Sequence, residues 1–150
     1  HLFHFDGADD GKVVRFIGAP VMTASQYFPN LLGHLGEVIR ASGVSAELEM
    51  DAVPLLPGAR RLAAANIVPG GTKRNLESAQ RFTRFGDKSR VERLLLADAQ
   101  TSGGLLMAIA APLSGALLQA LDEEGDKGVV IGRVTERDFA DGPAGAISVL

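Results

Sequence analysis

The chain has 150 residues and a formal net charge of −3, with 46% apolar and 22% charged residues, which is typical of one globular domain. The negative net charge argues against nucleic acid or an anionic membrane as a partner. There is no cysteine, which excludes disulfides, cysteine-ligated zinc and thiol nucleophiles within these residues. No apolar run approaches the roughly 18–20 residues that span a bilayer, so we expect no membrane segment. The absence of cysteine is compatible with a cytoplasmic protein, which is the location we expect.

The first predicted element is a β-hairpin formed by residues 1–6 and 13–17, joined by a turn rich in glycine and aspartate. His1 and His4 lie on its first strand and supply no third ligand at metal spacing. Residues 21–29 are irregular, because the proline at 29 disfavours a helix just before it. We therefore expect neither a metal site nor a helix in this part of the chain.

Residues 31–40 carry apolar side chains at 31, 35, 38 and 39, a spacing that predicts a helix with one buried face. Gly43 is suited to end that helix. Gly33 and Gly36 inside it are costly for a helix and therefore indicate close packing against another element. His34 flanks the apolar face and fits either a packing histidine or a pocket residue.

A strand with one wet face is predicted over residues 45–50, and a short alanine-rich helix over 59–66. Residues 68–75 form a polar node that we expect to be an ordered loop, because Pro-Gly-Gly does not continue a helix. Hydroxyl, ammonium, guanidinium and amide groups beside glycine N–H groups can grip a phosphate, and a solvated loop is the alternative. The candidate phosphate-facing residues here are Gly71, Thr72, Lys73, Arg74 and Asn75.

Positive charge gathers in the segment that follows. Residues 73–93 include seven basic and three acidic side chains, a local net charge of +4, which leaves −7 for the rest of the chain. This asymmetry points to an anionic ligand or an acidic partner surface. A solvated charged face is the alternative for any one of these residues.

A second polar node is the tight turn at residues 98–104. A leucine-rich helix over 90–97, capped by Ser89 or Asp87, leads into it, and an apolar run at 105–110 leaves as a buried strand. Glycines allow positive φ, and adjacent N–H groups in such a turn can bind an anion; an ordinary helix-to-strand connection is the alternative. The candidates here are Gln100, Thr101, Ser102, Gly103 and Gly104.

Pro112 opens a further helix with an apolar stripe at 113, 116, 117, 120 and 121, which Gly125 ends. Residues 128–134 are predicted to form a strand, and residues 146–150 an edge strand. Alternating helices and strands favour a sheet with helices packed on it. P-loop, dinucleotide-binding and serine-hydrolase motifs are absent. From the residues alone we therefore predict only an α/β domain, with an anion-binding edge as a hypothesis.

Five stretches then occur in a specific order, at residues 31–35, 51–59, 70–76, 100–106 and 130–134. Together they resemble the C-terminal domain of selenophosphate synthetase (selenide, water dikinase), in the larger group that includes aminoimidazole ribonucleotide synthetase. The resemblance covers about residues 30–136. It implies an α+β domain over residues 30–150, with a mixed β-sheet, packed helices and a loose relation to the ferredoxin-like arrangement. Residues 1–29 do not match the family and are expected to be a separate hairpin and irregular segment.

The resemblance also implies a parent reaction in which ATP, selenide and water give selenophosphate, AMP and phosphate with magnesium. In that family the reactive cysteine or selenocysteine, the catalytic lysine and most metal-binding aspartates belong to the N-terminal half. We therefore expect no catalytic residue, metal site or cofactor in this chain alone, and the N-terminal catalytic domain and a second copy as partners. The family's Thr-Asp-Val-Thr-Gly-Phe-Gly, whose aspartate is a metal ligand, is replaced here by residues 23–30, which contain no carboxylate.

The first function hypothesis is the C-terminal domain of a selenophosphate synthetase-like protein. It would be inactive alone and would close over the nucleotide site with both polar nodes facing the phosphates. The second is a non-catalytic binding or scaffolding module that docks an acidic protein or nucleic acid through residues 73–93. A thiamine-monophosphate kinase relative is a third, against which the Gln-Thr-Ser-Gly-Gly string argues. The first hypothesis predicts that the two polar nodes meet at one rim of the sheet.

Overall fold

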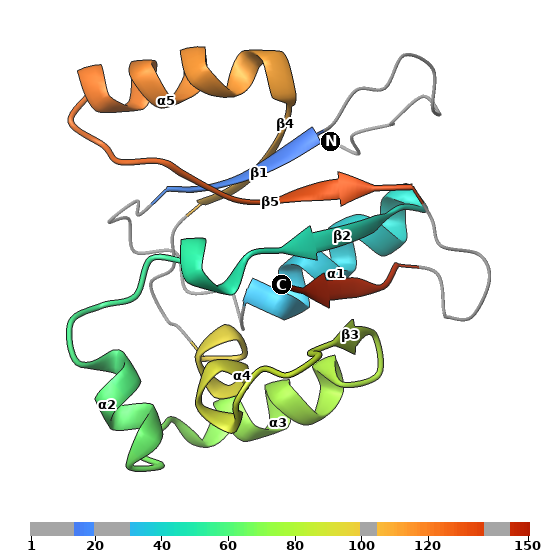
Figure 1. Cartoon of the computed structure of the whole chain (residues 1–150), viewed down its shortest axis with the longest axis vertical. Coiled ribbons are helices and arrows are strands. Elements are labelled where there is room, and N and C mark those ends of the chain that lie inside the picture. The colour runs from blue at the N-terminus through green and yellow to red at the C-terminus, as the bar shows by residue number, and fades with distance from the viewer. Residues whose placement is uncertain (1–13, 20–30, 100–104, 137–144) are drawn as a thin grey trace.

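The computed structural model describes residues 14–19 by their backbone, and residues 31–99, 105–136 and 145–150 in full. Helices and strands are mixed along the chain (Figure 1). The strands are β1 (Val14–Ala19), β2 (Ser45–Leu48), β3 (Thr83–Arg84), β4 (Leu105–Ala110), β5 (Val129–Thr135) and β6 (Ile147–Val149). The helices are α1 (Leu31–Ser42), α2 (Ala59–Ala64), α3 (Gly70–Ala79), α4 (Arg90–Leu96) and α5 (Ser114–Glu123).

The described strands form one six-stranded sheet in the order β3-β6-β2-β5-β1-β4. The pairs β2–β6 and β3–β6 are parallel, and the other neighbours are antiparallel. Helix α1 lies behind β2 and β6 in Figure 1, α3 and α4 gather near β3, and α5 lies near β4. The fold is therefore α+β with a mixed sheet and packed helices, as the resemblance predicted. None of the described helices is long and apolar enough to cross a membrane.

The core lies between α1 and the β2–β6 part of the sheet. Leu32, Leu35 and Ile39 of α1 are fully buried, because they recur at helical spacing on one face. They belong to one cluster with Leu48 of β2 and Ile147 of β6. Burying such side chains stabilises a fold by roughly 1.5–3 kcal/mol each, so this cluster holds α1 on the sheet.

Several predicted elements are confirmed. Helix α1 begins at Leu31, and Gly43 follows it with φ of +68°, the left-handed conformation that glycine adopts without strain. Gly36 packs as its position suggested, since a Cβ built there would lie 2.6 Å from Cε2 of Phe82. Val38 is an exception on the predicted stripe, because it is 43% exposed, whereas Leu32, which the predicted stripe left out, is fully buried.

Two strand predictions are wrong about burial. The apolar run that forms β4 was expected to be buried, but it lies at the sheet edge and none of its residues is fully buried. Residues 146–150 were expected at an edge, but β6 lies between β3 and β2, with Ile147 and Val149 buried. Position in a sheet depends on pairing between distant segments, and the two-residue strand β3 gives almost no local signal.

The second strand of the predicted N-terminal hairpin forms part of β1 in the sheet. Over Arg15–Gly18, β1 is paired with β4 on one side and β5 on the other, so both of its edges are occupied. The predicted first strand, residues 1–6, lies outside the described residues, as do residues 20–30. The division of the chain at residues 29 and 30 stays a prediction.

Candidate functional site

The first polar node opens a helix and is not the ordered loop that the sequence predicted. Helix α3 begins at Gly70, directly after Pro69 at the N-cap. Proline and glycine disfavour the interior of a helix, but the first N–H groups of a helix need no partner within it, so the same residues can begin one. The predicted residues Gly71, Thr72, Lys73, Arg74 and Asn75 therefore lie in the first two turns of α3.

The second polar node begins where α4 ends. Gln100, Thr101, Ser102, Gly103 and Gly104 lie outside the described residues, and Asp98 and Ala99 are the last residues described before them. These two residues contact the first node. The Thr72 hydroxyl donates to Asp98 Oδ1 at 2.8 Å and accepts from the Ala99 N–H at 3.2 Å. The flanks of the two nodes are thus brought together across 26 residues of sequence.

Two further contacts support this junction. Asn75 Nδ2 donates to the Ala97 carbonyl at 3.2 Å, one turn further along α3. A Cβ built on Gly71 would lie 3.1 Å from the Cβ of Ala99, so the missing side chain lets the two elements approach closely. Helices α3 and α4 are packed together over this region.

The predicted residues of α3 divide into two kinds. Thr72 is 0% exposed and its hydroxyl is engaged by Asp98 and Ala99, so its side chain joins the two helices and does not face solvent. Lys73 and Arg74 are exposed on the same turn. Sequence reasoning missed the Thr72–Asp98 contact, because no local pattern links two residues so far apart in the chain.

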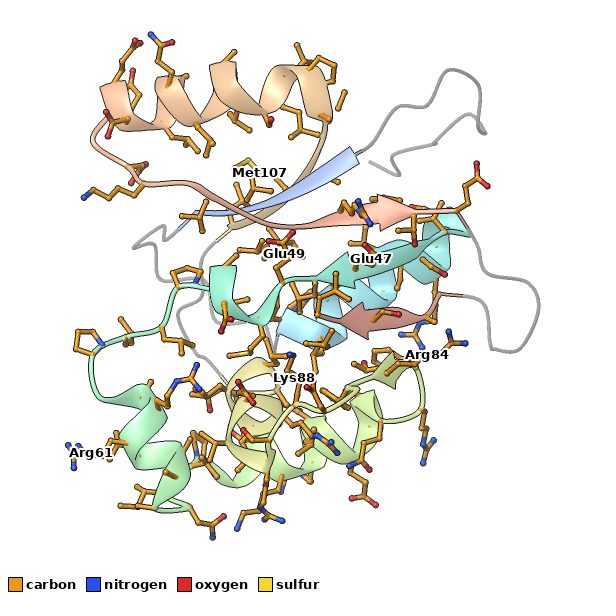
Figure 2. All side chains as sticks on the ribbon, viewed as in Figure 1. Glu47, Glu49, Arg61, Arg84, Lys88 and Met107 are labelled. Carbon is orange, nitrogen blue, oxygen red and sulfur yellow. The ribbon has the colours of Figure 1, made fainter. Side chains whose placement is uncertain are left out.

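The basic segment at residues 73–93 is only partly available to a ligand. Arg93 lies over the ring of Phe85 at 5.3 Å, and its Nε donates to the Lys88 carbonyl at 2.8 Å, so it stabilises the turn before α4. Figure 2 shows Arg84 and Lys88 at separate places, the first on β3 and the second in that turn. The exposed cations of the segment are Lys73, Arg74, Arg81, Arg84 and Arg90.

The start of α4 settles the alternative of Ser89 or Asp87 in favour of Ser89. The Ser89 side chain accepts from the Glu92 N–H, and Glu92 accepts from the Ser89 N–H at 2.8 Å, which is a complete capping box. The hydrogen bonds from the Ser89 hydroxyl and N–H lower the pKa of the Glu92 carboxyl, and Arg60, with its NH1 3.6 Å from Glu92 Oε1, adds to this effect.

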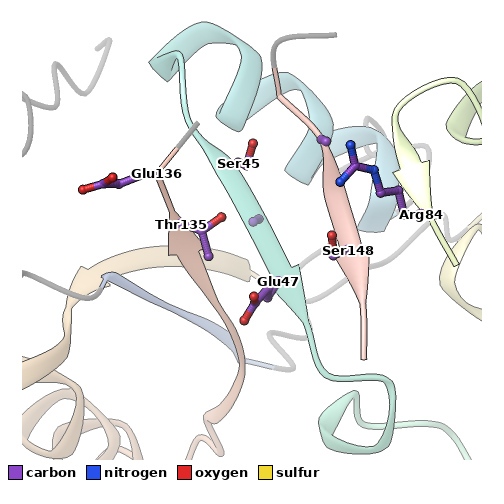
Figure 3. A pocket seen from close by; sticks show the side chains of 8 residues that line it. Ser45, Glu47, Arg84, Thr135, Glu136 and Ser148 are labelled. Carbon is purple, nitrogen blue, oxygen red and sulfur yellow. The ribbon is translucent and has the colours of Figure 1, made fainter. Parts of the chain in front are cut away.

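A separate hollow of about 420 Å³ lies over β2, β5, β6 and β3 (Figure 3). None of the predicted phosphate-facing residues lines it. The Arg133 guanidinium pairs with the Glu47 carboxylate across β5 and β2, with Nε 2.6 Å from Oε2. The strand predicted over residues 45–50 ends at Leu48, and on its predicted wet face Ser45 is buried and Glu47 half-buried. The hollow is lined by Ser45, Ala46, Glu47, Arg84, Thr135, Glu136, Ala146 and Ser148.

Titratable groups elsewhere form no metal site among the described residues, which hold no cluster of three or more histidine, aspartate or glutamate side chains suited to a metal ion. His34 is half-buried on α1. Burial lowers the pKa of His34, and the nearby Glu37 carboxylate acts in the opposite direction.

Comparison with known proteins identifies the family. Residues 30–141 match the family described as AIR synthase related protein, C-terminal domain. The chain belongs to this family. The matched range covers α1 through β5 and so includes both polar nodes of this AIR synthase related domain.

The most similar relatives include two proteins called "Selenide, water dikinase". The domain is 43% identical over 136 residues to that of Cronobacter sakazakii (strain ATCC BAA-894), which covers 91% of this chain and 37% of the relative. It is 38% identical over 133 residues to that of Yersinia pseudotuberculosis serotype I (strain IP32953), covering 89% and 36%. The resemblance to this group is therefore confirmed, and the chain spans about a third of the length of these relatives.

A solved structure is also similar. The crystal structure of thiamine-monophosphate kinase from Stenotrophomonas maltophilia K279a shares 19% sequence identity with the AIR synthase related domain. The similar region covers 87% of this chain and 30% of that chain, with a TM-score of 0.49.

Proposed function

We propose that this chain is the C-terminal domain of a selenophosphate synthetase-like protein and that it is not catalytic alone. The observation that carries the proposal is the 43% identity to a "Selenide, water dikinase" over nearly the whole chain. The parent reaction would use ATP, selenide, water and magnesium in the cytoplasm. The reactive groups would come from an N-terminal catalytic domain, with which this domain and a second copy assemble.

Within this proposal, the first turn of α3 and the turn at residues 100–104 face the phosphates of the nucleotide. Lys73 and Arg74 are exposed and supply positive charge beside the N-terminus of α3. Backbone N–H groups at a helix N-terminus also favour negative charge. Gly71 contributes to the α3–α4 junction, because its missing side chain lets Ala99 pack closely against the start of α3. Thr72 and Asn75 contribute by holding the α3–α4 junction.

A chimera tests the proposal. This chain is placed behind the N-terminal part of the Cronobacter relative, replacing the region that it matches, and ATP-dependent selenophosphate formation is followed by ³¹P NMR. The chimera should be active, and the chain alone should turn over no ATP. An inactive chimera that is folded and contains an intact N-terminal part would overturn the proposal, as would ATP turnover by the pure isolated chain.

Charge variants of the chimera test the residue assignment. Lys73→Ala and Arg74→Ala should each lower kcat/KM for ATP by about ten- to a hundredfold, since a charge-assisted hydrogen bond to phosphate contributes roughly 1.5–3 kcal/mol. Arg81→Ala is the matched control, because Arg81 is an exposed cation of the same basic segment but follows the C-terminus of α3. Equal losses in all three variants would contradict the assignment.

The second candidate function is a non-catalytic module that docks an acidic protein or nucleic acid through residues 73–93. It is favoured by the five exposed cations of that segment. This function predicts binding to RNA or an acidic peptide that weakens steeply with salt and does not respond to nucleotide. Titrations of the isolated chain at two salt concentrations distinguish the two functions.

A further inference from the structure

One buried hydroxyl joins the start of α3 to the end of α4. Thr72 Oγ1 uses both of its hydrogen-bonding roles at once, donating to Asp98 Oδ1 and accepting from the Ala99 N–H. We call these three residues the Thr72 bridge. Because Thr72 is 0% exposed, water reaches its hydroxyl only if the contact between the helices opens.

A second buried threonine, Thr83, allows a comparison with Thr72. Thr83 of β3 is also buried, at 7% exposed, but its hydroxyl has no hydrogen-bond partner in the part of the chain that the structure describes. Replacing threonine by valine removes a hydroxyl and keeps the shape of the side chain. At position 72 the change removes the hydrogen-bond partner of a carboxylate oxygen and of an N–H, whereas at position 83 it removes no hydrogen bond among the described groups.

We infer that Thr72 is a positioning residue, whose hydroxyl fixes Asp98 and Ala99 against the turn of α3 that carries Lys73 and Arg74. The contact at Gly71 and the Asn75 bond to Ala97 keep the two helices in register on either side of the bridge. The consequence for ATP use rests on the proposed function, while the geometric part of the inference does not. A purely structural role for Thr72 would change stability without changing the placement of Ala99.

Native-state hydrogen exchange on the full 150-residue chain tests the geometric part. In Thr72→Val, the Ala99 amide should exchange about tenfold faster relative to the Ile39 amide of α1, which reports on global opening. Thr72→Ser keeps the hydroxyl and should stay within about threefold of the parent chain. Thr83→Val should leave the ratio unchanged. If Thr72→Val and Thr83→Val give the same Ala99 ratio, the inference is wrong.

Asp98, the half-buried acceptor of the Thr72 hydroxyl, provides a second variant in case Thr72→Val does not fold. Asp98→Ala removes the acceptor that orients the hydroxyl and should speed exchange at Ala99 severalfold. Asp98→Asn keeps an oxygen at Oδ1 and should preserve the parent rate within about threefold. An Ala99 rate that is the same in both Asp98 variants would contradict the bridge.

The chimera described above tests the consequence for ATP use. Thr72→Val should lower kcat/KM for ATP about tenfold, with activity restored in Thr72→Ser and unaffected in Thr83→Val. If the unmodified chimera is inactive, the proposed function fails and the exchange result still decides the bridge. If the unmodified chimera and Thr72→Val are equally active, the positioning role fails while the proposed function stands.

Discussion

Two parts of the same sheet are packed very differently. Around β2 and β6, helix α1 buries three large side chains completely, and the neighbouring strand residues join one core cluster. In β4 no residue is fully buried, and Ser114 is the one buried residue of α5. The part around β2 and β6 is therefore closely packed, whereas β4 and α5 are only partly buried.

The difference shows how little an apolar stripe says about burial. Helix α5 carries apolar residues at helical spacing, as α1 does, yet Ala116 and Ala120 are exposed, and Leu113 before the helix is 57% exposed. Helix α1 lies over central strands, while α5 lies near the sheet edge formed by β4 (Figure 1). Fewer neighbours at an edge leave the same pattern half-covered.

The largest effect is expected from cavity formation in the packed part. Leu35→Ala should lower the free energy of unfolding by about 2–5 kcal/mol, because Leu35 is fully buried and a core generally relaxes only partly into the cavity left behind. Leu113→Ala, at the exposed start of α5, should change it by less than about 0.5 kcal/mol. Urea denaturation of both variants measures the contrast, and equal losses would break the comparison.

Adding a side chain at two glycines, Gly132 and Gly115, tests the same difference in packing. A Cβ on Gly132 of β5 would lie 2.2 Å from the Glu47 carbonyl oxygen, so Gly132→Ala should push β5 away from β2 and cost about 3 kcal/mol. A Cβ on Gly115 of α5 meets nothing within 4 Å, so Gly115→Ala should stabilise the protein by about 0.5–1 kcal/mol. Thermal melts of the two variants should shift in opposite directions.

The capping box of α4 gives a smaller effect. Ser89→Ala removes the side-chain acceptor for the Glu92 N–H and should cost about 1 kcal/mol in urea denaturation. Helix α5 has no side-chain hydrogen bond at its N-cap, Leu113, so it provides the comparison. Ser89→Thr, which keeps a hydroxyl, is the control and should retain most of the stability.

The smallest effect concerns the pKa of the Glu92 carboxyl, which the hydrogen bonds from Ser89 lower below its ordinary value of 4.5. A carboxyl with a lowered folded-state pKa stabilises the fold above its unfolded-state pKa, and that contribution is lost as pH falls through the folded-state value. Ser89→Ala removes the side-chain bond and keeps the backbone one, so the pKa should rise part of the way. A carbon-detected NMR titration of Glu92 checks this, and an unchanged midpoint would contradict it.

Local sequence signals predicted those features that depend on neighbouring residues. The sequence predicted the positions of α1 and α4, a cap at Ser89 or Asp87, and the glycines that follow α1 and α5, because capping and helical spacing act within one or two turns. The family resemblance and the fold class were also readable from the order of short motifs, and the match over residues 30–141 confirms them.

The sequence by itself therefore determined where most helices begin and end and to which family the chain belongs. Only the tertiary structure decided that β6 is central, that β4 is an edge, and that the Thr72 hydroxyl turns inward to Asp98. The physical reason is distance along the chain. Strand order and the Thr72 bridge arise from contacts between residues dozens of positions apart, and such contacts leave no periodicity or local motif by which to recognise them.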